Sequence, residues 1–140
     1  MKHFTVLTIM IGLFFLNSPV HSQVGSSCSE PHVITSLPFV QAGMTTSGFG
    51  DNYSSTACGS NDYISGCEYI FEYTPTVDQE IRINLTNIGY GIGIFVLDRC
   101  MDDPASECVA SVTEGSGSLE LSSANLLQDS TYYIVISTWD

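Results

Sequence analysis

The amino-acid sequence predicts an all-β domain, an antiparallel β-sandwich, and three observations lead to this fold class. Apolar residues beyond residue 67 come in short runs, several with the two-residue period of a strand that has one buried face. Residues that favour turns, mainly glycine, serine, asparagine and proline, separate these runs. No part of the chain beyond residue 22 shows the pattern of an amphipathic helix. Short strands of this kind bury their apolar faces by packing two sheets together.

The first 22 residues have the pattern of a cleavable secretory signal peptide. Lys2 and His3 give a short polar start, and Val6–Leu16 form an apolar run too short to anchor the chain across a bilayer. Val20-His21-Ser22 approximates a cleavage site. Cleavage removes the one hydrophobic helix candidate, so we expect no stable membrane insertion of residues 23–140, which suit a single domain. The predicted location is secreted or cell surface.

The segment after the signal peptide is predicted to be mostly irregular. Gln23–Ser29 are small and polar and suit a flexible start that becomes ordered near Cys28. Short apolar patches, interrupted by a proline, follow over Val33–Val40. Gly43–Gly66 is rich in glycine, serine, threonine and asparagine, as loops are. A loop of this length in a compact domain is expected to be functional or to be held in place by Cys58.

Six strands are predicted after this loop. The first carries its aromatic side chains on one face, and the second alternates isoleucine and leucine with polar residues, so each has one face in the core. The third is apolar on both faces, which indicates a central strand covered from both sides. The last is dense in aromatic and β-branched residues. The predicted strands are Glu68–Tyr73, Gln79–Thr86, Gly91–Asp98, Cys108–Val112, Gly117–Ser122 and Thr131–Thr138.

The connections between these strands are predicted to be turns. Glu114–Gly117 has turn composition, and Ser123–Gln128 is expected to form one helical turn. The glycine-rich stretch Gly89–Gly93 lacks the lysine and the helix of a phosphate-binding loop, so it predicts a bend or bulge before the central strand. Because the sequence stops at Trp139 and Asp140, directly after its strongest strand, we expect it to be the N-terminal part of a longer protein.

The cysteines predict disulfides. All five, Cys28, Cys58, Cys67, Cys100 and Cys108, follow the predicted cleavage site, and an oxidising compartment lets such bonds persist. An odd number leaves one cysteine unpaired. The short separations predict the pairs Cys58–Cys67 and Cys100–Cys108, each of which closes a small loop. Cys28 is then a free thiol or pairs with a group outside the chain.

The chain is acidic, with a formal net charge of −12. Such a field disfavours nucleic acid and anionic membrane surfaces as partners. Scattered carboxylates keep an exported protein soluble, and they also supply the oxygen ligands that calcium prefers. Calcium is therefore the candidate cofactor, and basic ligands or surfaces are a further possibility. The candidate calcium ligands form two groups, Asp98, Asp102, Asp103 and Glu107 between two cysteines, and Asp51, Asn52 and Asp62 in the long polar loop.

Three tyrosines are candidate ligand-binding residues. Tyr53, Tyr63 and Tyr90 all fall in predicted loops. Loop tyrosines can stack on sugar rings or anchor protein partners. The same side chains suit a role in covering the ends of the sandwich, and both interpretations are left open.

The residues of an active site are nearly absent from the sequence. Beyond the predicted cleavage site there is no lysine, and the one histidine, His32, stands beside Pro31 near the N-terminus. A serine or cysteine nucleophile would need such a base close by. No pair of carboxylates is marked as flanking a sugar cleft. We expect no enzymatic activity.

Several strand motifs resemble the bacterial pre-peptidase C-terminal domain family. They are Tyr69-Ile-Phe-Glu-Tyr-Thr-Pro75, Ile81-Arg-Ile-Asn-Leu85, Gly93-Ile-Phe-Val-Leu97 and Thr131-Tyr-Tyr-Ile-Val-Ile136. Upstream, Thr45-Thr46, Ala57-Cys58-Gly59-Ser60 and Gly66-Cys-Glu-Tyr69 look like the form found in exported proteins of the Bacteroidetes. The resemblance covers roughly Cys28–Trp139. Ser47 departs from it, because relatives often have a cysteine at this position that would pair with Cys58.

The resemblance implies a jelly-roll-like β-sandwich with an accessory role. Such domains flank secreted peptidases and other hydrolases or sit in surface adhesins, often ahead of a type IX secretion sorting domain. Some relatives bind calcium, polysaccharide or collagen. The main hypothesis is therefore a non-catalytic adhesion or binding module of an exported bacterial protein, with polysaccharide or an extracellular protein as partner. The alternative is a structural or secretion spacer that supports a neighbouring secreted peptidase or glycosidase.

Overall fold

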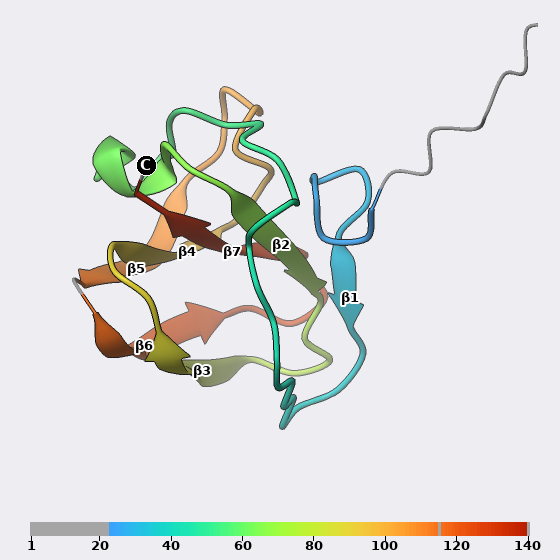
Figure 1. The fold of residues 1–140 in the computed structure, drawn as a ribbon. Helices are drawn as coiled ribbons and strands as arrows, with labels where there is room; N and C mark the ends of the chain where they lie inside the picture. Colours follow the sequence, from blue (N-terminus) through green and yellow to red (C-terminus); the bar gives the residue numbers. More distant parts are fainter. Residues whose placement is uncertain (1–22, 115, 140) are drawn as a thin grey trace, which may run out of the picture.

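A computed structural model describes residues 23–114 and 116–139 of the protein (Figure 1). The predicted signal peptide, residues 1–22, lies outside the described residues. The described part contains seven strands and one short 3₁₀-helix. They are β1 (His32–Ile34), η1 (Asn61–Ile64), β2 (Glu68–Tyr73), β3 (Gln79–Ile88), β4 (Ile92–Leu97), β5 (Cys108–Glu114), β6 (Gly117–Leu126) and β7 (Tyr132–Thr138).

The strands form two sheets that pack against each other, so the predicted all-β sandwich is confirmed (Figure 1). The larger sheet has the strand order β1-β2-β7-β4-β5, and the smaller sheet consists of β3 and β6. The pairings are antiparallel, except that β1 runs parallel to β2. This parallel pairing is possible because the long segment 35–67 lets the chain return to the end of the sheet where β1 began.

The main core lies between the two sheets and follows the predicted alternation. Tyr69, Phe71 and Tyr73 of β2 point into it, while Ile81 of β3 is buried against them. Removing these side chains from water is the main source of stability in a domain of this kind. The other buried members of this core are Ile34, Ile92, Ile94, Val96, Leu119, Leu121, Ala124, Leu126, Tyr132 and Ile134.

A second, smaller core lies on the outer face of the larger sheet. Ile70, Phe95, Leu97 and Val135 alternate along their strands with residues of the main core, and all four are fully buried. Ile64 of η1 packs against these four side chains, together with residues of the long polar loop before β2. Strand β4 is therefore covered on both faces, as its apolar sequence predicts, and every one of its residues is buried.

Strand β6 continues to Leu126, so the predicted helical turn over Ser123–Gln128 is wrong. Its buried residues are Leu119, Leu121, Ala124 and Leu126, a series in which one step is three residues instead of two. At this step the pairing with β3 shifts register between Ile81 and Ile83. A bulge of this kind adds one residue to a strand and keeps its apolar side chains on the same face.

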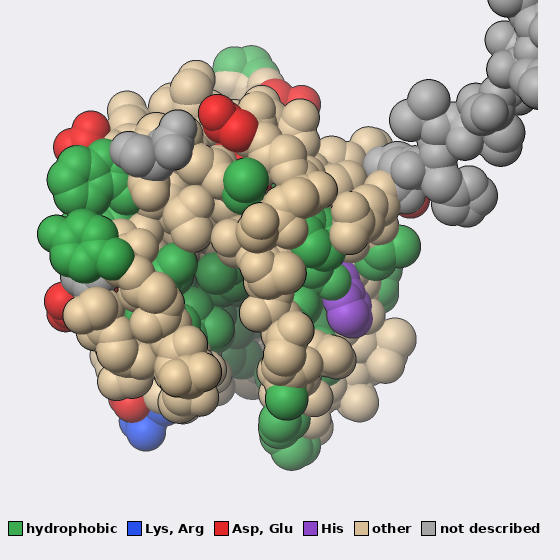
Figure 2. Space-filling model, viewed as in Figure 1, with side chains coloured by type: hydrophobic (Ala, Val, Ile, Leu, Met, Phe, Trp, Pro, Cys, Tyr) green, Lys and Arg blue, Asp and Glu red, His purple; other side chains and the backbone are tan. Residues whose placement is uncertain are grey.

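The smaller sheet covers only part of the larger one, and an open groove lies beside β3. Its base is the inner face of the larger sheet, and the segment 37–46 forms its far wall. The groove has a volume of about 1300 Å³. Figure 2 shows this hollow, with hydrophobic side chains at its base. The two sheets thus do not close completely on each other.

Candidate functional site

Three aromatic side chains meet at the end of the sandwich where β7 ends. Trp139 directly follows β7, and its ring centroid lies 6.1 Å from that of Tyr90 and 6.2 Å from that of Tyr63. Tyr90 belongs to the turn between β3 and β4, and Tyr63 belongs to η1. We call Tyr63, Tyr90 and Trp139 the aromatic platform. It unites two of the three tyrosines predicted to bind ligand with a tryptophan for which the sequence predicts no site.

The platform is open to solvent. Tyr90 is 71% exposed and Trp139 is 50% exposed, whereas Tyr63 is partly buried beside them. The ring of Trp139 is inclined by 33° to that of Tyr90 and by 43° to that of Tyr63. Single exposed apolar residues are common on protein surfaces, but adjoining large aromatic rings are typical of places that bind a partner.

Backbone hydrogen bonds hold the segments of the platform together. The amide of Trp139 donates a hydrogen bond to the carbonyl oxygen of Gly91 at 2.7 Å, and the amide of Gly66 donates one to the carbonyl oxygen of Thr138 at 2.9 Å. Gly91 has a φ of +67°, and a Cβ atom there would lie 2.9 Å from the Cβ of Trp139. Glycine is thus required at this turn both for the backbone conformation and for the approach of the tryptophan. The fully buried Ile64 anchors η1.

The chemistry of the platform suits sugar rings. An aromatic ring packs its face against apolar C–H groups, and tyrosine and tryptophan add a polar group at the edge. A sugar ring presents C–H groups on its faces and hydroxyl groups around its rim. Asp62, which is exposed in η1 next to Tyr63, offers carboxylate oxygens that can accept hydrogen bonds from hydroxyl groups. The arrangement can therefore hold a sugar by stacking and by polar contacts at its rim.

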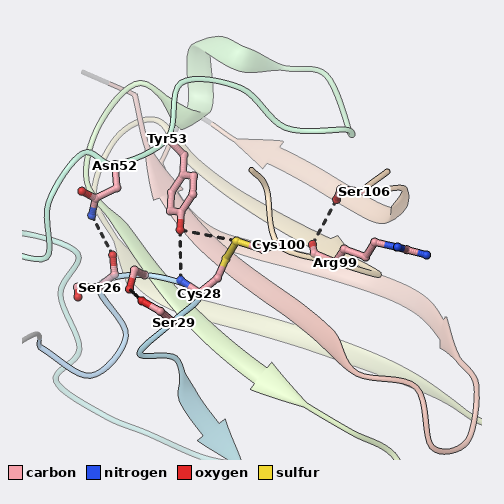
Figure 3. The surroundings of a disulfide bond; sticks show 9 residues. Ser26, Cys28, Ser29, Asn52, Tyr53, Arg99, Cys100 and Ser106 are labelled. Atoms are coloured by element: carbon pink, nitrogen blue, oxygen red, sulfur yellow. Dashed lines mark hydrogen bonds between the residues drawn. A yellow bond between two sulfur atoms is a disulfide. The ribbon is translucent and has the colours of Figure 1, made fainter. Parts of the chain in front are cut away.

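Tyr53, the third predicted ligand-binding tyrosine, packs against the outer core, as Tyr63 also does, and Figure 3 shows it beside a disulfide. Its hydroxyl oxygen accepts a hydrogen bond from the amide of Cys28 at 3.2 Å and lies 3.7 Å from the Sγ atom of Cys100. The structure therefore gives Tyr53 a role in supporting a disulfide, and the ring contacts of the platform do not include it.

The disulfides differ from the predicted ones. Cys28 pairs with Cys100 (Figure 3) and Cys58 with Cys108, with Cα–Cα distances of 5.8 Å and 4.7 Å, and Cys67 is a free thiol. The predicted pairs Cys58–Cys67 and Cys100–Cys108, with Cys28 unpaired, are wrong. Proximity in sequence favoured short loops, but folding brings the N-terminal segment and the long loop next to the β4–β5 connection. The bonds tie these distant segments together.

Two disulfides are typical of proteins in oxidising, extracytoplasmic compartments. This agrees with the extracytoplasmic part of the predicted location. Over the described ranges, 23–114 and 116–139, no helix has the length and apolar character needed to cross a membrane.

The first predicted calcium group lies in the β4–β5 connection, where two of its four carboxylates, those of Asp98 and Asp103, have partners within the protein. Asp98 accepts a hydrogen bond from the amide of Glu107 at 2.6 Å, and Asp103 accepts one from the amide of Ala105 at 2.8 Å. The guanidinium of Arg99 lies 3.6 Å from the carboxylate of Asp98 and 3.8 Å from that of Asp103. These contacts shape the loop that carries Cys100, and a cation there would compete with Arg99.

The members of the second predicted calcium group lie in two segments, the loop before η1 and η1 itself. Asn52 donates from its side-chain amide to the carbonyl oxygen of Ser26 at 2.9 Å and packs near the start of β2, as Asp51 does. Asp62 lies in η1 beside the platform instead. In the part of the chain that the structure describes, no three acidic, histidine or cysteine side chains are arranged to hold a metal ion. Calcium binding stays a hypothesis.

Glu68, the first residue of β2, carries a buried carboxyl group that was not among the predicted site residues. It is 0% exposed, and its Oε2 atom accepts a hydrogen bond from the amide of Asn52 at 3.0 Å. Its Oε1 atom has no partner within the described residues, and neither has the buried hydroxyl of Ser137, which lies opposite Glu68 in β7. Burial, with a smaller contribution from Asp51, raises the pKa of Glu68 to about 7. A charged residue at a strand end usually faces water, so no sequence signal marked it.

Comparison of the chain with protein-family models, with curated proteins and with solved structures gives no match. The resemblance to the pre-peptidase C-terminal domain family and the Bacteroidetes origin therefore stay predictions.

Proposed function

We propose that this domain is a non-catalytic attachment module of an exported protein and that it binds neutral polysaccharide through the aromatic platform. The observation that supports this is the grouping of Tyr63, Tyr90 and Trp139 at one end of the sandwich, with Tyr90 mostly exposed and Trp139 half-exposed. Each ring comes from a different segment, and backbone hydrogen bonds fix these segments to one another. A preorganised platform binds without first having to order its side chains.

The charge of the chain limits the kind of polysaccharide. A formal net charge of −12 repels polymers that carry carboxylate or sulfate groups. A neutral polymer has no such penalty, and its hydroxyl groups can donate hydrogen bonds to exposed carboxylates such as Asp62. We therefore expect binding to cellulose or xylan and none to alginate.

Tryptophan fluorescence tests this proposal directly, because Trp139 is the only tryptophan of the sequence. Titration with soluble xylo- and cello-oligosaccharides should shift its emission to shorter wavelength as sugar replaces water on the ring. Retention on insoluble xylan and cellulose should fall roughly two- to tenfold in Trp139→Ala, since one aromatic stacking contact contributes about 0.5–1.5 kcal/mol. Leu127→Ala is the matched control, because Leu127 is also exposed but lies near the start of β7.

The outcomes separate the alternatives. Retention that Trp139→Ala weakens and Leu127→Ala does not would support the platform. Equal retention of both variants would indicate that polysaccharide binds elsewhere on the domain. Retention on collagen alone would favour a protein partner. If the intact domain binds neither polysaccharide nor collagen, the spacer hypothesis is favoured instead.

A further inference from the structure

Strand β3 has one edge that no other strand of the described residues occupies. It pairs with β6 along its other edge, and no described backbone group outside β6 forms a hydrogen bond with it. In an antiparallel pair, alternate residues of a strand direct their N–H and C=O groups away from the partner. Strand β3 spans ten residues, so a long row of such groups faces the groove. An edge of this kind is a template for a further strand.

The base of the groove matches the side chains of a strand. Tyr69, Phe71 and Tyr73 line it at two-residue intervals along β2, and Ile134 and Ile136 do so along β7. An added strand next to β3 would direct every second side chain onto this apolar surface and the others towards solvent. The segment 37–46 opposite β3 contributes further apolar wall. Backbone pairing with β3 and burial of apolar side chains would thus both stabilise the bound strand.

The groove differs in charge from the rest of the molecule. Among the described residues that line it, only Glu80 and Arg82 are charged, and their charges cancel. Arg82 also lies 3.4 Å from Glu120 on the neighbouring strand. The chain as a whole carries a net charge of −12. The groove is therefore complementary to an uncharged segment, and the acidic molecule around it favours basic residues at the ends of that segment.

We propose that this groove binds an extended strand of a partner protein, which pairs with β3 and completes the smaller sheet. The strand has apolar residues at alternate positions, spans up to the length of β3 and carries lysine or arginine at its ends. A second copy of this chain fits less well, because two molecules of charge −12 repel each other. The site is separate from the sugar-binding proposal, although Tyr90 lies at one end of the groove.

A synthetic peptide serves as the probe. It has eight residues of alternating valine and threonine with a lysine at each end, and its control has two of the valines replaced by proline, which cannot donate a backbone hydrogen bond. Binding is measured by fluorescence anisotropy of the labelled peptide. Amide hydrogen exchange of the whole chain then locates the site. We expect the valine–threonine peptide to bind and to slow exchange in residues 79–88 at least about tenfold, and the proline peptide not to bind.

Two protein variants connect binding to the groove. Met44→Lys places a charge on the groove wall, at a side chain that is already exposed and whose replacement leaves both cores intact. Val77→Lys adds the same charge at an exposed position that does not line the groove. Both variants share the general electrostatic effect of a new lysine, but only Met44→Lys places the charge against the bound peptide. Met44→Lys should therefore weaken peptide binding at least about fivefold more than Val77→Lys does.

Three results would overturn the proposal. Unchanged exchange in residues 79–88 with bound peptide would place the peptide elsewhere. Equal binding of the proline peptide would mean that backbone pairing is not involved. Dimerisation of the chain alone, with slowed exchange confined to residues 79–88, would identify a second copy as the occupant.

Discussion

At the scale of single residues, Glu68 is the group with the most unusual environment. Its side chain is fully buried at the start of β2, and only one of its two carboxylate oxygens has a hydrogen-bond donor within the described residues. The folded protein therefore favours the neutral acid, and the pKa is raised from 4.5 to about 7. This one carboxyl group makes the stability of the domain depend on pH near neutrality.

Glu68→Gln should remove this dependence. Below pH 4.5 the side chain of Glu68 is neutral in both states and has no effect. As pH rises towards 7, the unfolded chain releases the proton first, so the free energy of unfolding falls. Above pH 7 this decrease in the free energy of unfolding is complete and amounts to a loss on the order of 3 kcal/mol. Urea unfolding at pH 4, 6 and 8 should show wild type and Glu68→Gln about equal at pH 4 and the variant more stable at pH 8.

The matched control for this comparison is Glu80→Gln, at an exposed position of β3. It should follow the pH profile of the wild type. The interpretation fails if Glu68→Gln has the same pH profile as the wild type, since Glu68 would then not carry the dependence.

At the scale of elements, strands were predictable where their side-chain alternation is regular, and cysteine pairing was not. The predicted bounds of β2 and those of the structure are the same, Glu68–Tyr73. In β6 a bulge breaks the alternation after Leu121, and a local pattern cannot distinguish this from a helical turn. The disulfides depend on where the long loop lies over the sheet, which is a property of the whole fold. For the same reason, Trp139 could not be assigned to the platform from the sequence.

Removal of one disulfide should destabilise the domain strongly. The Cys58–Cys108 bond joins residues 50 positions apart, and in the chain-entropy model a loop of this size contributes about 4 kcal/mol. The double variant Cys58→Ala/Cys108→Ala should therefore lose about 2–5 kcal/mol in urea unfolding without reductant. Cys67→Ser removes the free thiol and should change the free energy of unfolding much less. Comparable losses in both variants would contradict the observed pairing.

At the scale of the whole molecule, the sequence predicted two packed sheets but not their unequal size. Alternation along a strand indicates which face is buried and carries no information on how many strands each sheet has. The position of the segment before η1 is likewise set by long-range contacts, including both disulfides and the buried Ile64. The groove, which arises from these features, was therefore visible only in the structure, whereas the apolar sequence of β4 already indicated a second covered face.

The net charge of −12 should make stability depend on salt. Repulsion among the carboxylates opposes folding, and dissolved ions screen it. We expect sodium chloride to raise the Tm in calorimetry, and calcium chloride at equal ionic strength to raise it equally, because Arg99 and loop amides already contact Asp98 and Asp103. A larger rise with calcium that disappears in Asp102→Asn would instead support a calcium site in this loop.

The two disulfides also determine what happens to the chain once it has been cut. The Cys28–Cys100 and Cys58–Cys108 bonds overlap in sequence, so any peptide bond between residues 28 and 108 lies inside at least one covalent ring. A protease that cleaves the exposed residues 40–45 leaves two pieces that are still joined. Separation of the pieces needs a reductant as well as a protease. In a compartment that preserves disulfides, a nicked molecule thus stays a single covalent body with its strands still attached.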